Sequence, residues 1–277
     1  MIVVKNLAVN KGGQSIVRGI NLQVRPGRIS VLLGKNGAGK STVLEALTGK
    51  NTFSEGNITW DNYPLTKLTN QTLAQRRAVL SQSVTVPFAI TVQQLVEMGT
   101  YVATEALPNQ KIASLVEEAL TTVGLSTFGT RNFQTLSGGE QKRALLAKCL
   151  VQLNCCHWAD VNKYLFLDEP TAGLDMEQQF HLLALLKRLV RRRQIGVLAV
   201  VHDVNLAAQL ADELILLKAG QIATTGSPGE VLTPELLQEV FSVTARVHPH
   251  PVLDCPYVTL LPHQPTAHSA SFSNSTY

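Results

Sequence analysis

The chain has 277 residues, 45% of them hydrophobic, so it can bury a substantial core as one large domain or two smaller ones. Its formal net charge of +4 suits an anionic ligand or a lipid surface without requiring nucleic acid, and aromatic residues, at 5%, are too scarce to stack single strands. No apolar run approaches the roughly 18–20 residues that cross a bilayer, and the N-terminus lacks a signal-peptide pattern. We therefore expect a cytosolic protein that reaches a membrane only through a partner.

The first third of the sequence alternates between strand patterns and turns. Residues 2–9 and 20–24 are predicted to form strands, and residues 56–65 a further strand and turn. Residues 27–34 form a continuous apolar run, which is typical of a strand buried on both faces of a parallel sheet. This run leads into a glycine-rich turn and a helix that is predicted to begin near Lys40.

The glycine-rich turn, GKNGAGKS at residues 34–41, matches G-x-x-x-x-G-K-[ST] and lies between a strand and a helix, as a phosphate-binding loop does. Its glycines let backbone N–H groups point at phosphate oxygens, and the helix adds its positive end. We expect Lys40 to neutralise the β- and γ-phosphates, Ser41 to bind Mg²⁺ and Thr42 to contact the α-phosphate. The alternative is an ordinary glycine-rich turn without a ligand, which the flanking strand and helix patterns make less favourable. The expected ATP contacts are Gly34, Lys35, Asn36, Gly37, Ala38, Gly39, Lys40, Ser41 and Thr42.

Residues 91–153 change character, because their apolar residues recur with helical spacing and predict a helical subdomain inserted into an α/β core. Its last helix opens with LSGGE, although each helical glycine costs about 1 kcal/mol relative to alanine. Either a loop ends there, or something must approach the backbone closely. We expect Ser137, Gly138 and Gly139 to form a second anion site. Because it lies on the insert, it should meet the phosphate loop only when two copies pack head to tail.

The α/β pattern then resumes with strands predicted at 163–170 and 195–203 and a helix at 176–192 between them. Asp168 and Glu169 follow the first of these strands, at the edge where open α/β sheets bind ligands. Asp168 is placed to hold Mg²⁺, and Glu169 to orient or deprotonate an attacking water. Without the phosphate loop, LDEP could equally begin a helix.

Two further patterns follow in the last third. The helix ends in Arg191, Arg192 and Arg193, which suit a helix C-terminus better than a lipid patch. Residues 212–226 predict a hairpin that turns at Ala219 and Gly220.

Cysteine usage points to a reduced compartment, since none of the four cysteines occurs in a CxxC pair. Cys155 and Cys156 are neighbours and precede His157. A metal or haem site at these three residues is a disfavoured alternative, because neighbouring ligands alone do not close a tetrahedral site.

Six motifs occur in the order of one family: GKNGAGKST, Gln82 in VLSQ, LSGGEQ, YLFLDEP, TAGLD ending at Asp175, and His202 in VVHD. Over about residues 1–240 the sequence therefore resembles the ATP-binding cassette (ABC) ATPases. The resemblance implies an α/β fold, with a P-loop NTPase core, an antiparallel β subdomain and an α-helical signature subdomain inserted at about 88–155. Residues 241–262 would be a C-terminal extension, and the Ser/Thr-rich residues 263–277 a disordered tail.

The resemblance also implies roles for particular residues, with ATP and Mg²⁺ as cofactors. Glu169, His202 and Gln82 would be catalytic, with His202 bonded to the γ-phosphate. Ser41, Gln82 and Asp168 would hold Mg²⁺. Across a homodimer, each site would be completed in trans by Ser137, Gly138, Gly139 and Asp175.

The sequence departs from the family where an aromatic residue often stacks on adenine, because Lys11 stands at about that place. A cation–π contact from Lys11 would be weaker than stacking, so base specificity should be loose.

With no spanning segment, no coiled coil and a single cassette, the chain looks like the ATPase of a bacterial importer, at the cytoplasmic face of the inner membrane. A permease dimer would be the direct partner and a periplasmic binding protein an indirect one, without nucleic acid. The insert at 151–164 resembles the iron-chelate and vitamin B12 branch, and residues 226–251 resemble hemin importer ATPases. Ferric siderophore or vitamin B12 import, or a soluble non-transport ATPase acting on a macromolecule, remain alternatives. His248 and His250 are expected to form a rigid surface turn and no haem site.

Overall fold

The computed structural model describes residues 1–82, 84, 86–103, 105, 107–156 and 161–262. Its central sheet has the order β10-β9-β3-β8-β7-β6, in which only the edge strand β10 is antiparallel to its neighbour. Because parallel strands end at one edge, the loops after β3, β7 and β8 converge there. The strand bounds are β3 Ile29–Leu33, β6 Arg77–Leu80, β7 Tyr164–Asp168, β8 Gly196–Val200, β9 Glu213–Lys218 and β10 Gln221–Gly226.

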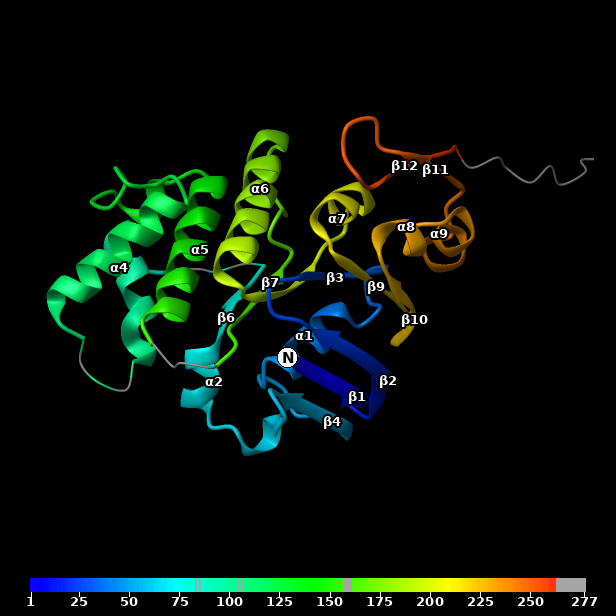
Figure 1. The fold of residues 1–277 in the computed structure, drawn as a ribbon, viewed down its shortest axis with the longest axis horizontal. Coiled ribbons are helices and arrows are strands. Elements are labelled where there is room, and N and C mark those ends of the chain that lie inside the picture. Colours follow the sequence, from blue (N-terminus) through cyan, green and yellow to red (C-terminus); the bar gives the residue numbers. More distant parts are fainter. Residues whose placement is uncertain (83, 85, 104, 106, 157–160, 263–277) are drawn as a thin grey trace, which may run out of the picture.

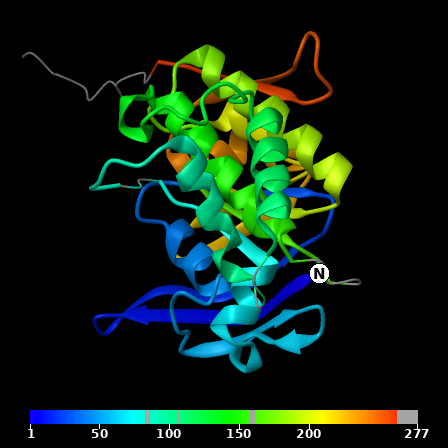
Figure 2. The same ribbon diagram turned by 90° about the vertical axis from the view of Figure 1, so that its left-hand side faces the viewer.

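A second, antiparallel sheet has the order β2-β1-β4-β5 and contains both N-terminal strands. Figures 1 and 2 place it at the opposite side of the molecule from the C-terminal hairpin. The strand predicted at residues 20–24 is longer than expected, because β2 pairs with β1 from the turn onward. The bounds are β1 Ile2–Lys11, β2 Gln14–Val24, β4 Glu55–Trp60 and β5 Tyr63–Pro64.

The helices between β6 and β7 form the expected helical insert, which lies beside the core in Figure 1. Together with the two sheets, this insert confirms the predicted fold class. Its elements are α3 Val92–Glu97, η2 Met98–Val102, α4 Asn109–Thr122, η3 Phe133–Thr135 and α5 Gly138–Asn154. The core helices are α1 Lys40–Leu47, α2 Asn70–Arg76, α6 Met176–Arg193 and α7 Val204–Leu210, with the short turn η1 at Leu65–Lys67.

Two hydrophobic cores lie on opposite faces of the central sheet. Alternate residues of β7 separate them, since Leu165 and Leu167 face the helical subdomain whereas Tyr164 and Phe166 face the antiparallel sheet. In the second core Trp60 packs edge-on against Tyr164, with ring centroids 5.0 Å apart. Burial on both faces explains why the predicted strands at 27–34 and 195–203 are continuously apolar.

The C-terminal region comprises α8 Pro228–Val231, α9 Pro234–Phe241 and a hairpin of β11 Ala245–Pro249 with β12 Pro256–Leu260. The expected rigid turn at the His-Pro-His-Pro sequence is therefore wrong in part, because His248 lies within β11. His250 does stabilise the loop that follows, since its Nδ1 accepts hydrogen bonds from the backbone of Val252 and Leu253. The expected disordered tail at 263–277 lies outside the described residues.

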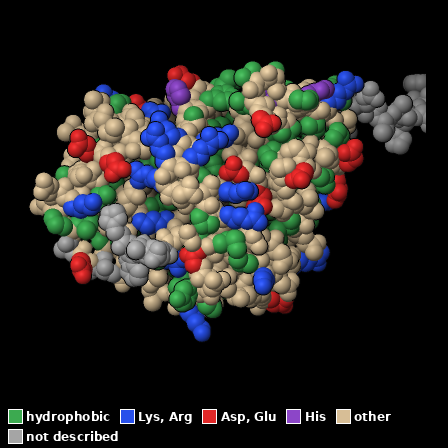
Figure 3. Space-filling model, in the orientation of Figure 1, with side chains coloured by type: hydrophobic (Ala, Val, Ile, Leu, Met, Phe, Trp, Pro, Cys, Tyr) green, Lys and Arg blue, Asp and Glu red, His purple; other side chains and the backbone are tan. Residues whose placement is uncertain are grey.

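The arginines at the end of α6 occupy its last turn, as predicted. Figure 3 shows Lys and Arg side chains gathered over this helix. Arg193 pairs with Glu118 of α4, and Arg188 donates to the carbonyl of Thr122, which ends α4. These contacts join the helical subdomain to the core, so part of the basic cluster has structural partners.

All four cysteines are free, and the neighbouring Cys155 and Cys156 are buried with their Sγ atoms 3.6 Å apart. Burial raises the pKa of Cys155 to about 12, so its thiol is protonated at neutral pH. His157, the third residue of the disfavoured metal site, lies outside the described residues. Within the described part of the chain, no helix is both long and apolar enough to span a membrane.

Candidate functional site: a nucleotide cleft

The phosphate-binding loop follows β3 directly and ends where α1 begins, as the sequence predicts. Two of its glycines are required by the surrounding chain. Gly39 has a φ of 100°, and a Cβ there would lie 2.4 Å from Cγ1 of Val17. A Cβ on Gly34 would lie 2.3 Å from the carbonyl oxygen of Leu217. The loop is thus held tightly between β2 and β9 with its N–H groups at a helix start.

Lys40 closes the loop from inside. Its Nζ donates to the carbonyl oxygens of Gly34 at 2.8 Å and of Lys35 at 2.9 Å, and only 5% of the residue is exposed. Burial lowers the pKa of Lys40, whereas the nearby carboxylates of Glu169 and Asp168 raise it. The two carbonyl contacts hold the Lys40 amino group inside the loop, where phosphate oxygens would bind.

A cleft of about 450 Å³ lies over this loop. It brings the loop together with two residues expected from distant parts of the sequence, Glu169 after β7 and His202 after β8. The signature residues 137–139 and Asp175 do not line it. The lining comprises Ile16, Asn36, Gly37, Gly39, Lys40, Ser41, Thr42, Glu169 and His202.

Glu169 is held from two sides at the mouth of the cleft. Nε2 of Gln82, which follows β6, donates to its Oε2 at 2.5 Å, and Nε2 of His202 is hydrogen-bonded to its Oε1. The backbone of Glu169 has a φ of 51°, in the left-handed region, and its N–H donates to the carbonyl of Val200. Three strand ends thus converge on one carboxylate, which suits a group that orients or deprotonates water.

Lys142 is a further residue at this site that the sequence analysis did not predict. Its Nζ donates to the carbonyl oxygens of Glu169 at 3.2 Å and of Ala172 at 2.6 Å. Burial lowers its pKa. It lies one helical turn after Gly138 on α5, so it fixes the loop after β7 to the signature helix. No signal in its local sequence distinguishes it from a solvent-exposed lysine.

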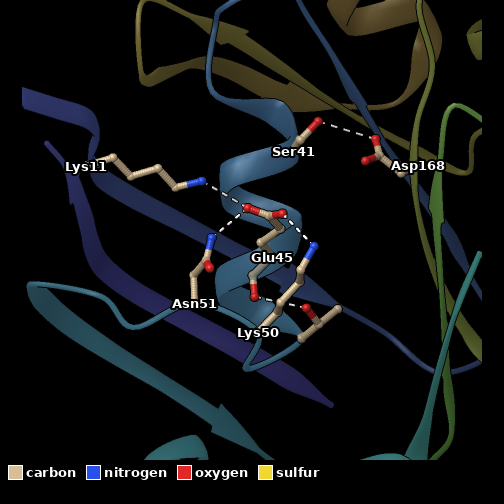
Figure 4. A network of polar contacts seen from close by, with 7 residues as sticks. Lys11, Ser41, Glu45, Lys50, Asn51 and Asp168 are labelled. Carbon is tan, nitrogen blue, oxygen red and sulfur yellow. Dashed lines mark hydrogen bonds and ion pairs between the residues drawn. The ribbon is translucent and has the colours of Figure 1, made fainter. Parts of the chain in front are cut away.

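The donor atoms next to the loop fit Mg²⁺, which prefers a few hard oxygen ligands together with substrate phosphates. Ser41 Oγ lies 3.4 Å from Asp168 Oδ1, at the start of α1 (Figure 4). Burial and the neighbouring carboxylate of Glu169 raise the pKa of Asp168, so a bound cation would be favoured there. Across the described residues, no cluster of three His, Cys, Asp or Glu side chains could bind a metal by itself.

The ammonium group of Lys11 forms an ion pair outside the cleft. Its Nζ lies 3.0 Å from Oε2 of Glu45 on α1, which also binds Lys50 and Asn51 (Figure 4). A cation–π contact from Lys11 to adenine would require this ion pair to open. Ile16, an aliphatic residue, lines the cleft instead.

The signature sequence LSGGE has a structural role within the chain as well. Ser137 Oγ accepts a hydrogen bond from the N–H of Glu140, whose carboxylate accepts one from the N–H of Ser137, which forms a capping box for α5. A Cβ on Gly139 would lie 1.8 Å from the side chain of Gln178. A Cβ on Gly138 would meet no atom closer than 3.9 Å, so nothing within one copy requires glycine there.

Comparison with known proteins agrees with this geometry. A family model described as ABC transporter matches residues 17–172. A hemin import ATP-binding protein HmuV from Hydrogenovibrio crunogenus is 40% identical over 253 residues, covering 91% of this chain and 96% of the relative. The chain belongs to the ABC transporter family. It is an ATP-binding subunit, because the phosphate-binding loop and the fold are those of the family's ATP-binding cassette.

Other similar proteins cover most of this chain. The HmuV protein of Rhizobium meliloti is 37% identical over 259 residues, covering 93% of this chain and 97% of the relative. A solved ABC transporter described as metal-chelate type, in an inward-facing conformation, has a TM-score of 0.77 and 26% identity, with coverage of 96% and 98%. A dimeric bacterial ABC transporter cassette has a TM-score of 0.71 and 25% identity, with coverage of 82% and 98%.

Because nothing within the described part of one copy requires glycine at position 138, we test whether the signature residues complete the nucleotide site of a second copy. We expect Ser137→Arg to leave ATP binding by the isolated chain nearly unchanged but to abolish hydrolysis, because the added side chain would block closure against the partner's cleft. The matched control is Ser114→Arg on α4. Nucleotide binding and turnover should be measured together, and in mixed dimers that combine Ser137→Arg with Lys40→Ala. If the Ser137→Arg homodimer hydrolysed ATP at the wild-type rate, LSGGE would act only as the N-terminal cap of α5 and not as part of the partner's site.

Proposed function

We propose that this cassette hydrolyses ATP to drive hemin import through a separate permease, as a homodimer bound peripherally at the cytoplasmic face of the inner membrane. The observation that carries the proposal is the 37–40% identity to proteins named for hemin import, which spans nearly the full length of both chains. The likeness to a transporter of metal-chelate type supports the same substrate class. A periplasmic binding protein would deliver hemin to the permease without contacting this chain.

The hydrolytic mechanism follows from the contacts in the cleft. Lys40 and the N–H groups of residues 34–42 bind the phosphates and neutralise their charge. A bound Mg²⁺, held by Ser41 and Asp168 with Gln82 nearby, would supply further positive charge at the β- and γ-phosphates. Glu169 orients a water and accepts its proton. His202 Nε2, which here is hydrogen-bonded to Glu169, would donate to the γ-phosphate in place of that contact when ATP is bound.

In the proposed dimer, the partner completes each site. Ser137 O–H and the N–H groups of Gly138 and Gly139 donate to the γ-phosphate of the opposite cleft, and Asp175 lines the seam. Asp175 Oδ1 already accepts from the N–H of Gln178, which places it at the start of α6 beside the signature. Composite sites would couple hydrolysis to dimer closure and hence to the permease.

A permease could dock on the surface around Gln82. A hollow of about 650 Å³ there is lined by Val79, Ser81 and Gln82, together with Glu45, Lys50 and Asp168 of the ATPase core. Large apolar side chains are exposed in the same part of the chain, including Phe88 at 54% and Tyr101 at 79%. Single exposed apolar side chains are common on protein surfaces, so the hollow at Gln82 is the feature that carries this part of the proposal. A partner bound here would contact Gln82, which holds Glu169.

The substrate is tested in proteoliposomes that contain the chain, its co-purifying permease and its binding protein. We expect ATP-dependent accumulation of hemin, and none when Glu169→Gln replaces the wild type. If a ferric siderophore or vitamin B12 accumulated and hemin did not, that compound and not hemin would be the transported substrate. Failure to co-purify with any polytopic membrane protein would favour a non-transport ATPase and contradict the proposal.

A further inference from the structure

The C-terminal hairpin lies against α7, the helix that follows His202 (Figure 1). Asn205, in the first turn of α7, pairs with the backbone of Val258 in β12 through both ends of its carboxamide. Its Nδ2 donates to the carbonyl of Val258 at 3.0 Å, and its Oδ1 accepts from the N–H of Val258 at 2.8 Å. Val258 is only 4% exposed and Asn205 is half-buried, so the pair is partly shielded from water.

A second contact joins the same region to the phosphate-binding loop. Nζ of Lys35 donates to Oγ of Ser242 at 2.9 Å, directly after α9. Ser242 has a φ of 58°, where the chain turns from α9 toward the hairpin. This hydrogen bond is exposed and hence weaker than the Asn205 pair. The Lys35 contact reaches the phosphate-binding loop, and the Asn205 contact reaches the helix that begins two residues after His202.

His202 lies in the short connection between strand β8 and helix α7. Only Val201 separates it from the end of β8. It is followed by Asp203, whose Oδ1 accepts from the N–H of Leu206 and so begins α7. The position of α7 therefore fixes the backbone that directly follows His202, whose Nε2 is hydrogen-bonded to Glu169. α7 has only seven residues, and a helix this short takes its orientation from packing rather than from its own stability.

We propose that Asn205 is a positioning residue for ATP hydrolysis, through which the C-terminal hairpin holds α7 and thereby aligns His202 with Glu169. This inference rests on the proposed ATPase mechanism. Residues 241–262 then contribute to catalysis without touching the nucleotide. A two-stranded hairpin is marginally stable alone, so the pairing with Asn205 stabilises both partners.

The test is Asn205→Leu in the full-length chain, which removes both hydrogen bonds while keeping a side chain of similar size. We expect kcat to fall about tenfold with KM for ATP within about twofold, as for a group that acts only on the chemical step. The matched control is Asn21→Leu, because Asn21 also accepts one backbone hydrogen bond and donates another, but in the antiparallel sheet. That control should keep the wild-type kcat.

A double-mutant cycle with His202→Ala separates positioning from general destabilisation. If Asn205 acts through His202, Asn205→Leu should cause no further loss of kcat in the His202→Ala background. An unchanged kcat in the single variant, or an equal loss in both backgrounds, would overturn the inference.

A second variant, Asn205→Asp, keeps the acceptor for the N–H of Val258 and loses the donor. This variant replaces the leucine variant in the test if the latter does not fold. We expect its kcat to be lowered, and an unchanged kcat would contradict the inference. Absence of hydrolysis by the wild-type chain would instead contradict the proposed ATPase function itself.

Discussion

Glu169→Gln is expected to bind ATP but to hydrolyse it about 10²–10⁴-fold more slowly than the wild type, the range lost with a general base. Glutamine keeps the size of the side chain and can still accept one hydrogen bond from Gln82 or His202. It cannot take a proton from water at neutral pH. Because ATP would persist in the cleft, the variant should also accumulate as a dimer.

Single-turnover hydrolysis and size-exclusion chromatography with ATP and Mg²⁺ measure the two effects of Glu169→Gln separately. Glu117→Gln is the matched control, since Glu117 is an exposed carboxylate on α4. It should turn over ATP like the wild type. Near-normal turnover by Glu169→Gln would assign the catalytic base to another group.

Lys40→Ala is expected to weaken ATP binding itself by about tenfold to a hundredfold, because one buried charge-assisted contact contributes about 1.5–3 kcal/mol. The loss includes the carbonyl oxygens of Gly34 and Lys35, which would be left without their donor. The effect should therefore appear in the dissociation constant and not only in the rate.

Titration calorimetry with ATP and Mg²⁺ measures the effect of Lys40→Ala, and circular dichroism reports whether the chain is folded. Lys50→Ala is the control, because the Lys50 side chain is 70% exposed and pairs with Glu45 beside the same helix. An unchanged dissociation constant in a folded Lys40→Ala chain would mean that the loop does not bind the phosphates as inferred.

Much of the site could be predicted because its motifs are local. The strand, turn and helix around Lys40 follow one another within 21 residues, from 27 to 47, and the motif together with these flanks indicates a phosphate-binding loop. Asp168 and Glu169 likewise follow a strand that is recognisable from its apolar run. In both cases the chemistry depends on residues that are neighbours in sequence.

The elements that were missed are short or depend on distant partners. β6 has four residues and α7 has seven, so neither shows enough of a period to be recognised. The hairpin of β11 and β12 is stabilised by Asn205, which is more than fifty residues from Val258 in sequence. Lys142 was missed for the same reason, since its role arises only when α5 packs against the loop after β7.

The sequence by itself determined the family, the P-loop core with its helical insert, and the position of the phosphate-binding loop, because these depend on local spacing and residue type. Only the tertiary structure decided which of them meet. The parallel order of β3, β8, β7 and β6 brings Gln82 and His202 to the Glu169 carboxylate. The packing of the antiparallel sheet and of the helical insert around this core pairs Lys11 with Glu45 and leaves the signature residues outside the cleft. The physical reason is that strand order and subdomain packing are set by the burial of two hydrophobic cores, which no short motif encodes.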